Sequence, residues 1–135
     1  MQSGTKNPDR VLSGVRVLVV EDEDDARELV TCMLTLSGAD VRAAASADEA
    51  LHAIDEFEPS VLVSDISMPG HDGYWLVSRV KSARPNLPCL AVTALTHRTD
   101  VERSYSAGFA RHLCKPFAPD VLVSEVASAV KRELR

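Results

Sequence analysis

Apolar residues along the chain form two kinds of segment, which alternate. Short runs rich in β-branched residues, bounded by acidic or turn-forming residues, predict strands. Between them, apolar residues recur three and four positions apart, as in Ala26, Leu29, Val30 and Met33, which is the spacing of one helix face. The predicted strands are residues 15–20, 41–45, 60–64, 89–93 and 110–113.

The predicted helices carry the apolar positions 26–33, 47–54 and 76–83, and two more helices cover 96–107 and 119–134. Ser46 and Glu49 match a capping box at the start of the second helix. The helix over 96–107 has few apolar residues, so we expect it to be held loosely. This alternation predicts an α/β protein whose parallel sheet is covered by helices on both faces.

The chain has the length and composition of one globular domain, with 135 residues of which 45% are apolar. Residues 1–14 are polar and rich in turn-forming residues, so we expect a flexible leader there and one domain over 15–135. No apolar run approaches the ~20 residues that cross a bilayer, and the leader lacks the apolar stretch of a signal peptide. These features favour a cytoplasmic protein without membrane insertion.

Acidic residues outnumber basic ones. Fifteen Lys and Arg against twenty Asp and Glu give a net charge of −5, which argues against direct binding to nucleic acid and favours a bound cation. Cys32, Cys89 and Cys114 are widely separated among apolar neighbours, unlike the close cysteine pairs of zinc and redox sites. We expect all three to be buried, reduced thiols.

Polar residues follow four of the predicted strands. Glu21 and Asp22 follow the first strand, Asp65 the third and Lys115 the fifth, and Thr93 ends the fourth. Ligands of such sheets bind at the carboxyl ends of the strands, so we expect these side chains to meet. Three carboxylates would repel one another unless a cation is present, and oxygen ligands of this kind suit Mg²⁺.

A carboxylate at such a site can also act as a nucleophile. Asp65 is the candidate acceptor, because carboxylates form aspartyl phosphates in phosphoryl transfer. The ammonium group of Lys115 and a metal ion would neutralise the transferring group, and the Thr93 hydroxyl would donate a hydrogen bond to one of its oxygens.

With these residues the sequence resembles the receiver domains of two-component response regulators, from about Val15 to Leu134. The segment from Leu12 to Leu18 is similar to the entry of receiver domains appended to hybrid sensor histidine kinases. The motifs that carry the resemblance are Val19–Glu23, Val63–Gly70, Asp72–Gly73, Val92–Ala94 and Lys115–Phe117.

The resemblance implies a flavodoxin-like (βα)5 fold with strand order 2-1-3-4-5. It implies that Asp65 accepts a phosphoryl group from a sensor histidine kinase or a histidine phosphotransfer domain. Asp22, Asp65 and the Ser67 carbonyl would bind Mg²⁺, with Glu21 binding through water. Thr93 and Lys115 would correspond to the switch hydroxyl and the phosphoryl-contacting lysine. The peptide bond from Lys115 to Pro116 would be cis, which proline permits at low cost.

The sequence departs from the family pattern at a few positions. Glu21 stands where many members have Asp, and its longer side chain still suits a water-bridged ligand. His112 stands where the family often has a Tyr or Phe that moves inward on phosphorylation; a titratable ring switch and an exposed edge-strand histidine both remain open. Ser67 and Leu95 would line the approach of hydrolytic water, and we expect apolar Leu95 to slow hydrolysis.

Surface features suggest partners. Trp75 is either an exposed contact residue or partly buried under a neighbouring loop. The last helix has a second apolar stripe of Val123, Ala127, Val130 and Leu134, which we expect to join the helix over 96–107 and the fifth strand in an output or homodimer face. The remaining histidines are expected to face solvent: His52, His71 and His97.

Other function classes fit less well. A phosphohydrolase that uses Asp22 and Asp24 would need Thr or Val where Ala26 stands, and it leaves Asp65 and Lys115 without a role. A receiver that is never phosphorylated is disfavoured because the acceptor, metal-binding and switch residues are all present. A nucleotide-binding Rossmann protein is excluded because carboxylates, not a glycine-rich loop, follow the first strand.

Overall fold

The computed structural model describes residues 10–133; expectations for residues 1–9 and 134–135 lie outside this part of the chain. The strands are β1 (Arg16–Val20), β2 (Asp40–Ala44), β3 (Val61–Ser64), β4 (Cys89–Thr93) and β5 (Arg111–Cys114). The helices are α1 (Asp24–Leu36), α2 (Ala47–Phe57), α3 (Gly73–Ala83), α4 (Arg98–Ala107) and α5 (Pro119–Glu133). Each strand lies within one residue of its predicted bounds.

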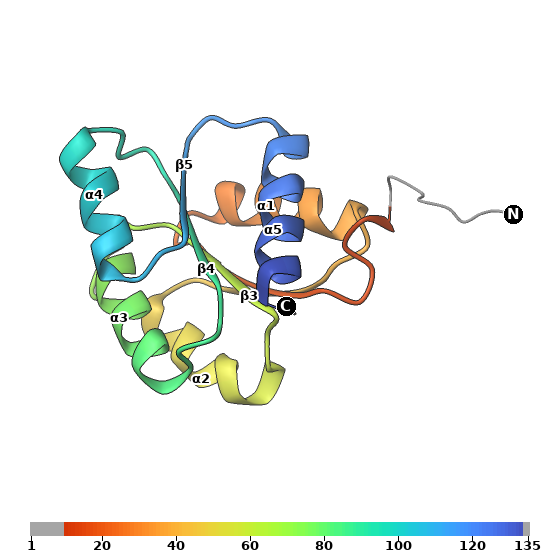
Figure 1. Cartoon of the computed structure of the whole chain (residues 1–135), viewed down its shortest axis with the longest axis horizontal. Helices are drawn as coiled ribbons and strands as arrows, with labels where there is room; N and C mark the ends of the chain where they lie inside the picture. Colours follow the sequence, from red (N-terminus) through yellow and green to blue (C-terminus); the bar gives the residue numbers. More distant parts are fainter. Residues whose placement is uncertain (1–9, 134–135) are drawn as a thin grey trace, which may run out of the picture.

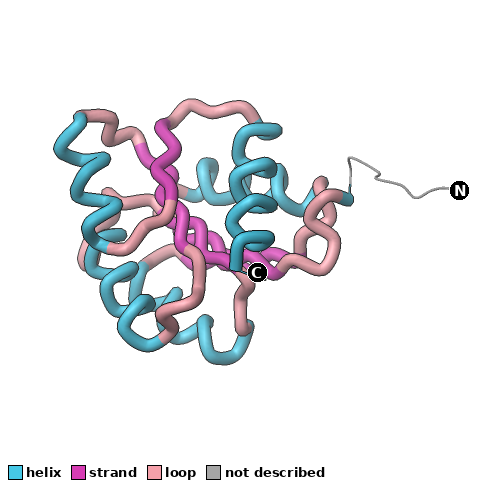
Figure 2. The backbone as a smooth tube through the Cα atoms, in the orientation of Figure 1, coloured by secondary structure: helices cyan, strands magenta, loops and turns pink. Residues whose placement is uncertain are grey.

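All strands are parallel and lie in the order β2-β1-β3-β4-β5. Helices α1 and α5 cover one face of the sheet and α2, α3 and α4 cover the other (Figure 1). The strands form a single layer between them (Figure 2). The predicted flavodoxin-like fold is confirmed. Strand order reverses between β1 and β3, so the carboxyl edge of these strands is the switch point at which ligands of such sheets bind.

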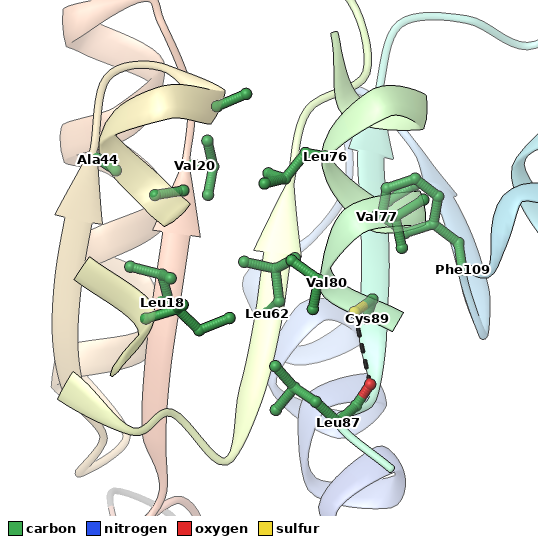
Figure 3. Close-up of a cluster of buried hydrophobic side chains, with 14 of the residues drawn as sticks. Leu18, Val20, Ala44, Leu62, Leu76, Val77, Val80, Leu87, Cys89 and Phe109 are labelled. Carbon is green, nitrogen blue, oxygen red and sulfur yellow. Dashed lines mark hydrogen bonds between the residues drawn. The ribbon is translucent and has the colours of Figure 1, made fainter. Parts of the chain in front are cut away.

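Alternate residues of each strand enter opposite cores. In β1, Leu18 and Val20 pack under α2 and α3, whereas Val17 and Val19 pack under α1 and α5. Figure 3 shows Leu18 beside Leu62 of β3 in the first of these cores. Each fully buried side chain of this size stabilises the fold by roughly 1.5–3 kcal/mol. Burial on both faces explains why β1 and β3 are continuously apolar in sequence.

Helix boundaries follow local capping chemistry. The Ser46 hydroxyl accepts a hydrogen bond from the Glu49 amide at 3.1 Å, and the Glu49 carboxylate accepts one from the Ala45 amide at 3.0 Å. The Ser46 half of the predicted capping box of α2 is therefore confirmed, whereas Glu49 accepts from the amide one residue before the N-cap instead of from the Ser46 amide. Asp72 caps α3 by accepting from the Trp75 amide at 2.9 Å. Within residues 10–133 no helix is both long and apolar enough to cross a membrane.

The packed part of the domain begins before the predicted boundary at residue 15. Leu12 is fully buried in the core under α1 and α5. Its amide donates to the Ser37 carbonyl at 2.8 Å, and its carbonyl accepts from the Val15 amide at 2.9 Å. The expectation of a flexible leader is thus wrong for this residue, which follows exposed Val11 in a segment otherwise rich in turn-forming residues.

The cysteine prediction is correct only for Cys89. This thiol is buried on β4, and burial raises its pKa to about 12, so it stays protonated at neutral pH. Cys32 on α1 and Cys114 on β5 are exposed. Apolar neighbours in sequence do not decide which side of an element a residue faces, and both of these thiols face outward.

The three histidines expected to face solvent, His52, His71 and His97, are exposed.

The second apolar stripe of α5 faces α1 and not the α4 side. Val123 and Ala127 line a groove of about 830 Å³ together with Leu29, Met33 and Leu36 of α1. The expectation that this stripe joins α4 and β5 in one surface is therefore wrong for these residues. Leu134, the last member of the stripe, lies outside the described residues.

Helix α4 has little apolar attachment, as predicted. Its buried residue is polar Ser104, which is fully inaccessible to solvent.

Trp75 of α3 is half-buried, which confirms the alternative of partial burial over that of an exposed contact residue. The His71 ring stacks on it at 3.6 Å and the Arg79 guanidinium lies 4.5 Å from its ring centre.

Gly73 lets α3 start directly against the end of β3. A Cβ atom at this position would lie 2.4 Å from the Asp65 carbonyl oxygen and 2.7 Å from the Ile66 Cα atom. Both are backbone atoms, so the contact cannot be relieved by a side-chain rotation. The glycine therefore sets how closely α3 approaches the loop that follows β3.

We expect Gly73→Ala to destabilise the protein by about 1–3 kcal/mol, the usual cost of overpacking. Alanine has the higher helix propensity, so any loss must come from the steric contact. Urea unfolding measures the change, and Ser82→Ala on the exposed side of α3 is the matched control. Equal stability of Gly73→Ala and the wild type would show that the backbone relaxes freely here.

Candidate functional site

The predicted site residues converge at the carboxyl edge of the sheet. Glu21 and Asp22 follow β1, Asp65 follows β3, Thr93 ends β4 and Lys115 follows β5. The backbone ladder continues past the strands, because the Asp65 amide donates to the Val20 carbonyl and the Lys115 amide to the Thr93 carbonyl, both at 2.9 Å. The chain segments that carry the side chains are thus rigidly linked.

Three carboxylates share a small volume at this edge. One oxygen from each of Glu21, Asp22 and Asp65 lies within 4.8 Å of the others. Glu21 and Asp65 are buried, at 2% and 7% exposure, and Asp22 is half-buried. An all-oxygen donor set of concentrated negative charge fits a hard divalent cation such as Mg²⁺ and does not fit zinc.

The ammonium group of Lys115 places a positive charge among these carboxylates. Its Nζ atom lies 2.7 Å from Glu21 Oε1 and 3.2 Å from Asp65 Oδ2. One ammonium therefore links the carboxylates that follow β1 and β3. The pairing of Lys115 with Glu21 was not predicted from the sequence, which assigned these residues to the phosphoryl group and the metal ion.

Burial and charge shift the ionisation of this pair. Burial raises the pKa of the Glu21 carboxyl, and the hydrogen bond from Lys115 only partly opposes this. Burial lowers the pKa of the Lys115 ammonium, but its hydrogen bond to Glu21 and the negative charges of Asp65 and Glu21 outweigh burial and raise that pKa overall. Lys115 stays charged at neutral pH, and Glu21 is a buried acid that would benefit from further positive charge beside it.

The Asp65 carboxylate is held at both oxygens. Oδ1 accepts a hydrogen bond from the Ile66 amide at 2.6 Å, and Oδ2 accepts from Lys115. Two fixed donors define the direction of the carboxylate before any ligand binds. Ser67, two residues further along, is exposed in the loop between β3 and α3.

Thr93 is buried, with 1% exposure, at the end of β4. Its Oγ1 atom accepts a hydrogen bond from the Leu95 amide at 3.3 Å. Leu95 is half-buried and packs on the core under α2 and α3. The hydroxyl is therefore tied to the first residues of the loop that leads to α4.

His112 is half-buried, so the alternative of an exposed edge-strand histidine is wrong. Both ring nitrogens have partners: the Leu95 carbonyl oxygen and the Ser104 hydroxyl, each at 2.8 Å. The ring thus lies between β5, α4 and the loop after Thr93.

The Lys115–Pro116 peptide bond is cis, as the resemblance implies.

Two further residues shape the site, although the sequence analysis gave neither a role: Arg27 was not singled out, and Gly73 was named only within the Asp72–Gly73 motif. The Arg27 guanidinium donates to the Glu21 carbonyl at 3.0 Å and pairs with Asp24 at 2.6 Å, and so fixes the acidic loop after β1. Gly73 sets the approach of α3 to the Asp65 backbone. The available signals were a basic residue two positions after a run of five acidic ones, and a glycine where a helix begins.

Residues 17–127 match the family model described as "Response regulator receiver domain". An uncharacterised 14.6 kDa protein of Leptolyngbya boryana is 37% identical over 116 residues, which cover 84% of this chain and 88% of that protein. The DNA-binding response regulator MtrA of Mycolicibacterium smegmatis is 32% identical over 117 residues, which cover 87% of this chain. The chain spans about half, 51%, of the length of MtrA.

Solved structures agree with this assignment. The receiver domain of the Francisella response regulator 1452 is similar, with a TM-score of 0.83, 28% identity, and coverage of 88% of this chain and 98% of that one. With this fold, these strand-end residues and these relatives, the chain belongs to the response regulator receiver domains of two-component systems.

Proposed function

We propose that this receiver domain accepts a phosphoryl group on the Asp65 carboxylate and transmits its presence to α4 and β5. The observation that carries the proposal is the Asp65 carboxylate itself. It is buried, directed by the Ile66 amide and Lys115, and grouped with two other carboxylates within 4.8 Å. Structural ion pairs need no such accumulation of uncompensated negative charge.

The donor is a phosphohistidine of a sensor histidine kinase or a histidine phosphotransfer domain. An Asp65 oxygen attacks phosphorus, the P–O bond forms, and the P–N bond to the donor imidazole breaks. The electron pair of that bond returns to the imidazole nitrogen, which takes up a proton. Lys115, already 3.2 Å from Asp65, compensates the negative charge of the phosphoryl oxygens.

Asp22 and Asp65 would hold Mg²⁺ directly, Glu21 through water, and Ser67 through its carbonyl oxygen. When bound, the metal ion supplies positive charge that offsets the carboxylates and the transferring phosphoryl group. The chain's own contribution is to hold the Asp65 carboxylate in one direction and to keep Lys115 charged beside it.

Thr93 is the candidate switch residue. Its hydroxyl would donate to a phosphoryl oxygen on Asp65, and its backbone carbonyl is already bonded to the Lys115 amide. Movement of Thr93 therefore acts on both β5 and the loop to α4. The face formed by α4, β5 and α5 stays the candidate homodimer surface, supported by exposed Tyr105 but not by Val123 and Ala127, which face α1.

Incubation with Mg²⁺ and a small phosphodonor should add one phosphoryl group, stable in acid and labile in base, to the full chain. The adduct forms because the Asp65 carboxylate is both the nucleophile and the group held in place. Intact-mass measurement detects it. We expect Asp65→Asn to remove the adduct, and chelation of Mg²⁺ with EDTA to suppress it.

Asp22→Asn is the matched control, since it removes one carboxylate of the same cluster without removing the acceptor. With excess Mg²⁺ this variant should still be modified. An adduct that survives in Asp65→Asn, or sustained turnover of phosphate esters, would contradict the receiver function and favour a phosphohydrolase.

Leu95→Glu should shorten the lifetime of the phosphorylated protein several-fold. The apolar side chain offers nothing that orients water near Thr93, whereas a carboxylate at this position can bind and orient an attacking water. The measurement is the decay of the adduct mass after the phosphodonor is removed. Leu95→Met is the control that keeps the position apolar, and an unchanged decay rate in Leu95→Glu would refute the role of this residue.

A further inference from the structure

Helices α1 and α5 cover the same face of the sheet, and a groove of about 830 Å³ lies between them (Figure 1). Five large apolar side chains are exposed within residues 10–133, and three of them line this groove: Val11, Leu29 and Leu36. Leu29 is 57% exposed and Leu36 is 71% exposed. Exposed apolar surface that gathers at one place on a soluble domain marks an interaction site.

The residues that line the groove are arranged symmetrically along each helix. Asp120 and Lys131 lie near the two ends of the α5 side, about three turns apart, so they face the same way. Leu29 and Leu36 lie at the two ends of the α1 side, about two turns apart. Both helices return from the carboxyl edge of one parallel sheet, and they therefore run in the same direction.

A two-fold axis that crosses both helices at their midpoints would bring two such grooves face to face. The α5 helices of the two copies would then be antiparallel, and so would the two α1 helices, which makes a four-helix bundle. Asp120 of each copy would meet Lys131 of the other, and Leu29 of each would meet Leu36 of the other. The groove therefore complements itself in both charge and apolar contact.

The centre of the groove suits close packing of helices. On α5 it is lined by the small residues Ser124, Ala127 and Ser128, and the distance between two helices depends on the side chains at the contact. Asp120 and Lys131 are the only charged side chains among the described residues that line the groove. A second copy would thus cover the apolar centre without burying an unpaired charge.

We propose that a second copy of this chain occupies the groove, in a symmetric dimer held by the α1 and α5 helices of both copies. The charges favour this occupant, because one acid and one base at opposite ends match an inverted copy of the same surface. Residues 1–9 suit the groove less well, since Met1 is the one large apolar side chain among them. The dimer does not involve Asp65 and forms without phosphorylation.

This surface differs from the candidate homodimer face of α4, β5 and α5. Glu125 of α5 pairs with Arg111 of β5 at 2.9 Å, whereas Ser124 lines the groove beside α1. Each surface carries one exposed native thiol, which is Cys32 in the groove and Cys114 on β5. The third cysteine of the chain is buried. Cross-linking through the native thiols therefore distinguishes the two surfaces.

Cross-linking of the full chain with a short bismaleimide, without a phosphodonor, tests where the second copy lies. The wild type and Cys114→Ser should form a covalent dimer on a denaturing gel, because Cys32 of each copy lies next to the two-fold axis. Cys32→Ser should stay monomeric on the same gel. Failure of Cys114→Ser to cross-link would overturn the proposal, and a covalent dimer of Cys32→Ser in its place would assign the second copy to the β5 face.

Charge reversal tests the two-fold arrangement by sedimentation equilibrium. Asp120→Lys and Lys131→Asp should each weaken dimerisation roughly tenfold, because each turns both symmetry-related attractions into repulsions. The double variant should recover the wild-type dissociation constant. It carries unfavourable charges for the helix dipole at both ends of α5, so this recovery cannot come from a more stable helix. Tyr105→Ala, on the exposed side of α4, is the matched control and should dimerise like the wild type.

A wild type that stays monomeric at high micromolar concentration would overturn the proposal and leave the groove to a partner of another sequence. Single reversals without effect would overturn it as well, as would a double variant that dimerises no better than either single variant. None of these measurements requires a phosphoryl group on Asp65. Failure of the proposed phosphoryl transfer would therefore leave their outcome unchanged.

Discussion

The crowding of three carboxylates, two of them paired with one lysine, is the constraint on which the rest of the structure depends. Three negative charges and one ammonium leave −3 + 1 = −2 when all are ionised, at an edge where two of the acids are buried. Lys115 holds the acids of two strands together but cannot neutralise them. The residual charge matches a divalent cation, and the position of Lys115 beside Asp65 matches an added anionic group. Under the proposed function, the charges of a divalent cation and a phosphoryl group would complete the site.

Different interactions hold the two halves of the carboxyl edge of the sheet, the half around β1 and β3 and the half beyond β4. Around β1 and β3, apolar strands buried on both faces and the glycine contact of Gly73 hold the acidic residues rigidly. Beyond β4, α4 is attached by the bonds of His112, Ser104 and Tyr74 more than by apolar packing. Polar attachments of this kind respond to a change of charge or hydrogen bonding, whereas a packed core does not. Under the proposed function, this division would let one fold hold the acceptor still while a neighbouring helix responds.

The sequence pattern predicted all five strands within one residue of their bounds. Burial on both faces makes the central strands β1, β3 and β4 almost continuously apolar, whereas the edge strands β2 and β5 are more exposed. The pattern failed where the decisive neighbour is distant in sequence. Residues 10–14 contain only two apolar residues, Val11 and Leu12, and Leu12 is buried because it packs with side chains of α1 and α5. The second stripe of α5 is apolar because α1 lies beside it, and no local pattern distinguishes that neighbour from α4. Cys32 and Cys114 show the same limit, since apolar neighbours in sequence do not specify the outward side of an element.

The site was easier to predict in its residues than in their contacts. Strand-end positions in a parallel sheet converge by topology alone, so Glu21, Asp65 and Lys115 could be grouped before any distance was known. The pairing of Lys115 with Glu21 could not be predicted, because the two residues are 94 positions apart and several acidic residues were chemically equivalent partners for the lysine. His112 is the clearer case. Its position in an edge strand is equally consistent with an exposed ring, and only the placement of Leu95 and Ser104 on either side turns the same residue into a link. The sequence of a strand cannot specify which donors and acceptors lie around a side chain, because these groups come from elements that are distant along the chain.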